Sequence, residues 1–129
     1  MTHWHRACAA IFTASCALPA LGQAGRRCDH ECLAYECSGR SVIAQQVLIA
    51  RMRDESIASA ASSAKTALLN QPRPVNAAVI DRLSRHYAAV AYKRPRLDAQ
   101  QILSAASDVH RLCMQNPDLY IGKEFITKP

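Results

Sequence analysis

The N-terminal two dozen residues constrain this chain most, because they decide how much of it folds and in which redox compartment. A short basic segment, residues 1–6, precedes an apolar stretch of small residues over 7–21. Gly22 and Ala24 then place small residues at the −3 and −1 positions of a signal-peptidase site. We therefore predict a cleaved signal peptide, a mature chain that starts near Gly25, and a periplasmic or secreted location.

Two other interpretations of this segment stay open. Lipid could be attached at Cys16, and the apolar stretch could instead be a buried N-terminal helix of a cytosolic protein. A membrane anchor is not expected, because Ser15, Cys16 and Pro19 interrupt the stretch and a transmembrane helix needs about 20 predominantly apolar residues. We expect no membrane span.

Four segments of the remaining chain repeat apolar residues at helical spacing, and none shows the alternation of a strand. The first covers about residues 41–53, the second starts at Ile57, the third follows Asn76, and the fourth ends before Asn116-Pro117. The apolar stripes are Val42, Ile43, Val47, Ala50 and Arg51; Ile57, Ala61, Ala64 and Leu68; Val79, Leu83, Tyr87 and Val90; and Ile102, Ala106, Val109 and Cys113.

Cap signals support these boundaries. Asn76 is suited to be an N-cap, and Asp98 with Gln101 three residues later forms a variant of the capping box. Asp54-Glu55 is the one adjacent acidic pair, and its place between two segments favours capping over acid-base chemistry. The sequence predicts an all-α fold, a small four-helix bundle linked by disulfides. Its expected parts are a signal peptide (1–24), a cysteine-rich segment (25–40), a helical domain (41–117) and a C-terminal tail (118–129).

Four cysteines follow the predicted cleavage site, and they permit three pairings. We expect Cys37 to pair with Cys113, because an even number of helices returns the chain to its starting end. Closing that loop of about 75 residues contributes about 4 kcal/mol in the chain-entropy model. Cys28 and Cys32 would then form a local bond. The alternative is a metal site built from Cys28, His30, Cys32 and Cys37. Its spacing fits no usual zinc or iron–sulfur pattern, so we expect no metal and no cofactor.

The formal net charge is +6, and Lys93, Arg94 and Arg96 form the densest basic cluster, with Arg51 and Arg53 elsewhere. Such a cluster is typical of a solvated surface or of a site for an anionic partner. Export and the shortage of stacking aromatics disfavour nucleic acid. We expect another protein as the partner; for the basic cluster itself, an acidic protein and the anionic cell envelope both stay open.

No catalytic motif is present in the sequence. There is no Gly-x-Ser-x-Gly elbow, and four glycines in the whole chain leave no phosphate-binding loop. His86 and His110 lie near the contact stripes of their helices, where a histidine is more often structural than catalytic. We therefore predict a non-enzymatic protein that binds another protein, as an inhibitor, immunity protein or chaperone. The alternative is a small cell-envelope hydrolase that uses His86 or His110.

Several short segments resemble those of small exported α-helical proteins of proteobacteria and their phages, which mostly lack an assigned function. These segments are Cys37, Ile43-Ala44, Ala50-Arg51-Met52-Arg53, Ser56, Ala91-Tyr92-Lys93-Arg94-Pro95 and Cys113. Residues 113–117 are also similar to the Cys-x-x-Asn-Pro ending of small periplasmic acid-stress chaperones. Both resemblances imply a helical exported protein, the second also a single disulfide, and neither implies a catalytic residue.

Overall fold

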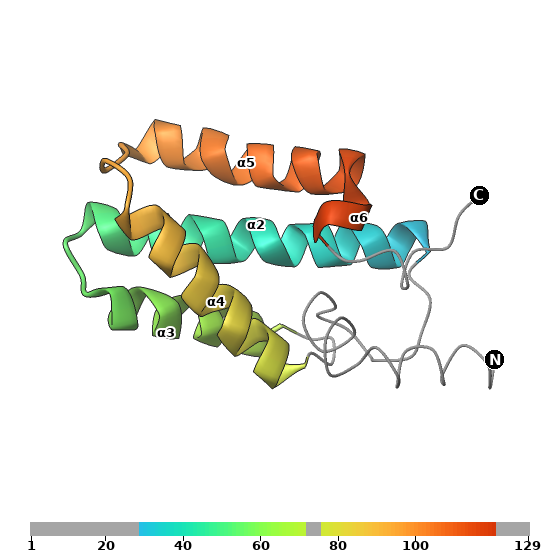
Figure 1. The fold of residues 1–129 in the computed structure, drawn as a ribbon, viewed down its shortest axis with the longest axis horizontal. Helices are drawn as coiled ribbons and strands as arrows, with labels where there is room; N and C mark the ends of the chain where they lie inside the picture. Colours follow the sequence, from blue (N-terminus) through green and yellow to red (C-terminus); the bar gives the residue numbers. More distant parts are fainter. Residues whose placement is uncertain (1–28, 72–75, 121–129) are drawn as a thin grey trace.

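The computed structural model describes residues 29–71 and 76–120, and these residues form an all-α bundle (Figure 1). Four long helices and one short helix make up the described part, which contains no strand. They are α2 (His30–Met52), α3 (Ile57–Leu69), α4 (Ala77–Tyr92), α5 (Ala99–Gln115) and α6 (Pro117–Tyr120). The expectation of an all-α bundle is confirmed.

The long helix α2 lies at the centre of the bundle. Helices α3 and α4 pack together against one side of it, whereas α5 runs antiparallel along another side (Figure 1). Helix α6 follows α5, and its Tyr120 packs against the buried Cys37 and Cys113. Within the described part of the chain, the buried members of the main apolar cluster come from three helices. Its buried members are Ile43, Val47 and Ala50 of α2, Ala60, Ala64 and Leu68 of α3, and Val79, Ile80, Ala88 and Ala91 of α4.

Helix α2 begins at His30, not near residue 41, so the expected boundary between segment 25–40 and the helical domain lies inside a helix. Asp29 is the N-cap, and its carboxylate accepts a hydrogen bond from the Cys32 N–H at 2.9 Å. The buried stripe continues through Glu36 and Arg40, which are both 1% exposed. Because these positions carry charges, a search for apolar periodicity misses the first three turns.

Helices α4 and α5 begin at the expected caps, and α3 begins at Ile57, as expected. Ser56 and Asn76 accept hydrogen bonds from the first turns of α3 and α4. Asp98 and Gln101 form the predicted capping box at the start of α5. Two expected core residues are exposed instead: Ile57 is 46% and Val90 is 38% exposed.

The disulfide Cys37–Cys113 is present and buried, as expected, and it joins residues 76 apart in sequence. Cys32 is also disulfide-bonded, while its predicted partner Cys28 lies outside the described residues. So do the predicted signal peptide and the possible lipid site at Cys16. Of the expected tail 118–129, the first three residues belong to α6, and the rest are likewise outside the described part.

Candidate binding surface at the loop end

Two connections far apart in sequence meet at one end of the bundle, which we call the loop end (residues 51–56 and 92–98). The Tyr92 hydroxyl donates to the Glu55 carbonyl oxygen at 2.7 Å. The Arg96 guanidinium pairs with the Asp54 carboxylate, with Nη1 and Oδ2 2.8 Å apart. These contacts fix the turn between α2 and α3 to the loop between α4 and α5.

The turn after α2 has the hydrogen bonds of a Schellman motif. The Glu55 N–H donates to the Ala50 carbonyl at 3.0 Å, and the Asp54 N–H to the Arg51 carbonyl at 3.2 Å. Asp54 occupies the left-handed position that such a motif requires, with φ 61°. Aspartate tolerates this conformation better than most residues. It also brings a carboxylate to Arg96, which the glycine usual at this position would not.

Arg51, in the last turn of α2, contacts the loop between α4 and α5. Its guanidinium lies over the Tyr92 ring, 5.2 Å from the centroid, and its Nη2 donates to the Arg94 carbonyl at 3.5 Å. Burial and the Glu55 carboxylate raise the pKa of Tyr92, while Arg51 opposes the rise. Tyr92 therefore stays protonated at neutral pH, as its hydrogen bond to Glu55 requires.

The predicted basic residues gather at this end, but they do not act alike. Arg96 forms an ion pair with Asp54. Arg51 lies over the Tyr92 ring and donates a hydrogen bond to the Arg94 carbonyl. Arg53, Lys93 and Arg94 are exposed, and none of the three makes an ion pair within residues 29–71 and 76–120. The loop end thus presents three cations whose charge remains available to a partner.

Sequence reasoning missed a buried polar cluster near the other end of the bundle. Arg40 Nη1 lies 3.1 Å from Glu36 Oε2 and donates to the Glu36 carbonyl at 3.0 Å. Burial raises the pKa of Tyr87 on α4, the Arg40 charge lowers it, and Tyr120 of α6 adds to the rise. Charged residues four apart within the α2 stripe were the available signal. Glu36 and Arg40 are both buried and offer no surface to a partner.

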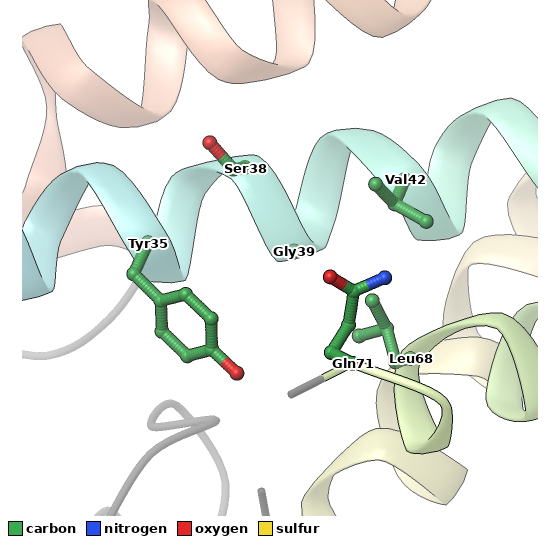
Figure 2. Close-up of a pocket in the computed structure, with 6 residues that line it drawn as sticks. All are labelled: Tyr35, Ser38, Gly39, Val42, Leu68 and Gln71. Carbon is green, nitrogen blue, oxygen red and sulfur yellow. The ribbon is translucent and has the colours of Figure 1, made fainter. Parts of the chain in front are cut away.

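A small cavity lies between α2 and the end of α3 (Figure 2). Its volume is about 70 Å³, whereas sites for small organic ligands occupy about 300 to 1,000 Å³. It has room for roughly two water molecules. The lining residues are Tyr35, Ser38, Gly39 and Val42 of α2, together with Leu68 and Gln71. Its size does not suit an organic substrate.

The two histidines considered as catalytic bases lie on different helices, His86 on α4 and His110 on α5. His86 stacks edge-on against Tyr87, with ring centroids 5.8 Å apart, and His110 is half-buried on α5. Within the described residues, no group of histidine, cysteine and carboxylate side chains could hold a metal ion. Cys32 and Cys37 are disulfide-bonded, so neither offers a thiolate to the considered zinc site. None of the described helices is both long and apolar enough to cross a bilayer.

The fold and this end of the bundle define a disulfide-linked helical protein with a basic surface. Comparison of the chain with family models, with curated proteins and with solved structures found no match.

Proposed function

We propose that this is an exported, non-catalytic helical protein that binds another protein through the loop end. The observation that carries the proposal is the set of three exposed cations, Arg53, Lys93 and Arg94, on two loops that are fixed to each other. A partner surface rich in carboxylates complements them. Inhibitor, immunity and chaperone roles would each use such a surface.

The order of the loop end favours a binding role for its cations over the alternative that they are only solvated. The Asp54–Arg96 pair, the Tyr92–Glu55 hydrogen bond and the stacking of Arg51 on Tyr92 hold the loops before a partner arrives. A surface that is already ordered loses less conformational entropy on binding. Charge of one sign also accelerates the encounter with an oppositely charged partner.

Location outside the cytosol rests on two features: the predicted signal peptide and the disulfide Cys37–Cys113. Structural disulfides persist in oxidising compartments and are rare in the cytosol. The proposal therefore places binding in the periplasm or outside the cell.

Site-specific photo-crosslinking in the producing cells tests the proposal. A photoreactive amino acid replaces Val90, which is exposed on the last turn of α4 near Lys93, and in a matched strain it replaces Ala78, which is exposed on the first turn. The two positions are about 18 Å apart along the helix. We expect a crosslinked protein at Val90 that is lost when Lys93→Glu and Arg94→Glu are added. Equal crosslinking at both positions, or none at Val90, contradicts the proposal.

The alternative of a small envelope hydrolase is tested by removing both candidate bases. The variant His86→Ala/His110→Ala should keep the crosslink and the cellular function, because neither residue belongs to the loop end. Loss of function in a variant that still folds, shown by an unchanged circular dichroism spectrum, would favour the hydrolase.

A further inference from the structure

Among the described residues, α5 contacts the other long helices mainly through α2. The main apolar cluster contains buried residues of α2, α3 and α4 and none of α5. Helix α5 packs against α2 and α6 and makes no comparable contact with α3 or α4. The other three long helices therefore complete their shared core without α5.

Among the described residues, the fully buried side chains of α5 are mostly small. The buried residues of α5 are Ile102, Ala106 and Cys113, of which only Ile102 is large. At the middle of the contact, the Ser41 hydroxyl donates to the Ala106 carbonyl at 2.7 Å. Helix α5 has three buried residues among 17, whereas α4 has five among 16, so burial of whole side chains stabilises α5 less than it stabilises α4.

The two ends of α5 are fixed by different means. The loop before it is fixed by the Asp54–Arg96 pair, whose side chains are 61% and 50% exposed and which is therefore screened by solvent. Near its other end, Cys113 is bonded to Cys37. The covalent bond is the stronger of the two attachments.

We propose that α5 is a latched helix, which the Cys37–Cys113 disulfide holds against α2 and which opens as a unit when that bond is absent. The α2–α3–α4 core remains folded, the loop 93–98 is the hinge, and the face of α2 that carries Cys37, Ser41 and Ala44 becomes accessible. This inference does not depend on the proposed function.

The burial of both sulfur atoms sets the order of events in a reducing environment. Cys37 and Cys113 are each 0% exposed, so a dithiol reductant reaches the bond only in molecules where α5 has begun to open. Reduction transfers two electrons from the dithiol, breaks the S–S bond and leaves two protein thiols and one oxidised dithiol. The open form then persists because the latch has been removed.

Hydrogen exchange followed by mass spectrometry tests the latch on the full chain. The variant Cys37→Ala/Cys113→Ala should exchange its α5 amides, from Ile102 to Cys113, on the order of a thousandfold faster than the oxidised protein. Amides of α3 and of residues 43–50 should accelerate clearly less than those of α5, because they exchange only when the α2–α3–α4 core itself unfolds. The control Ser41→Ala keeps the disulfide and loses one hydrogen bond, so its α5 amides should accelerate by about tenfold or less.

Two results would overturn the proposal. If all helices of the double variant lose protection together, the bundle is one cooperative unit and α5 is not separable. If α5 keeps its protection in the double variant, its noncovalent contacts suffice and the disulfide is not a latch. Oxidised protein treated with a dithiol provides a second measurement, in which α5 should lose protection before α3.

Discussion

Breaking the buried Glu36–Arg40 ion pair should be among the most damaging single changes in this protein. Both side chains are 1% exposed, and Arg40 makes two hydrogen bonds to Glu36, at 3.0 and 3.1 Å. Arg40→Met leaves the Glu36 carboxylate in this buried site without its guanidinium. Removing one partner of such a pair costs about 3 to 5 kcal/mol. That is a large share of the roughly 5 to 15 kcal/mol that stabilises a typical domain.

Urea unfolding followed by circular dichroism measures this loss, and the chain contains a matched control. Arg85→Met breaks the Arg85–Asp81 pair, which also joins residues four apart but has side chains 68% and 37% exposed. The control should cost less than about 1 kcal/mol. The double variant Glu36→Gln/Arg40→Met should lose less than the sum of its single variants, because each single variant already removes the direct interaction between the two side chains. An Arg40→Met cost as small as the control's would refute the reasoning.

Three further predictions follow from single residues. The Ser84 hydroxyl is buried without a hydrogen-bond partner among the described residues, so Ser84→Ala should raise stability by about 1 kcal/mol, or Tm by roughly 4 to 8 °C, in a thermal scan; an unchanged or lower Tm contradicts this. Burial raises the pKa of Tyr87 above its ordinary 10.0, so the folded state retains this proton more strongly and stability falls as pH rises from about 10 through the folded pKa. Tyr87→Phe should weaken that fall in urea titrations at alkaline pH, and an identical pH dependence would argue against Tyr87 as its source. Mass spectrometry of the exported protein should find Gly25 at the N-terminus, whereas a species that retains Met1 or carries lipid on Cys16 would overturn the predicted processing.

Local signals in the sequence were sufficient for most helix boundaries. Asn76 and the Asp98–Gln101 pair act within one turn of chain, so their role does not depend on the rest of the fold. The Cys37–Cys113 bond could be predicted because antiparallel helices return the chain to its starting end. The starts of these helices and the bond between the two ends of the bundle could therefore be predicted from the sequence.

Contacts between helices determine the features that the sequence did not predict. Helix α2 continues through Glu36, Gly39 and Arg40 because packing on several sides outweighs the helix propensity of a glycine and the charge of an ion pair. Ile57 and Val90 have the right periodicity for a core, but helix rotation within the bundle leaves them exposed. The Asp54–Arg96 contact joins residues 42 apart, and no local pattern encodes such a pair.

The central claim, that the loop end binds an acidic protein surface, is tested most directly by affinity measured against the partner that photo-crosslinking identifies. The variant Lys93→Glu/Arg94→Glu should bind at least about tenfold more weakly than the wild type, with a smaller dependence on salt concentration. The control Arg82→Glu changes an exposed arginine in the first half of α4 and should alter the affinity by no more than roughly twofold. Equal weakening by both variants, or unchanged affinity in the Lys93→Glu/Arg94→Glu variant, would contradict the claim.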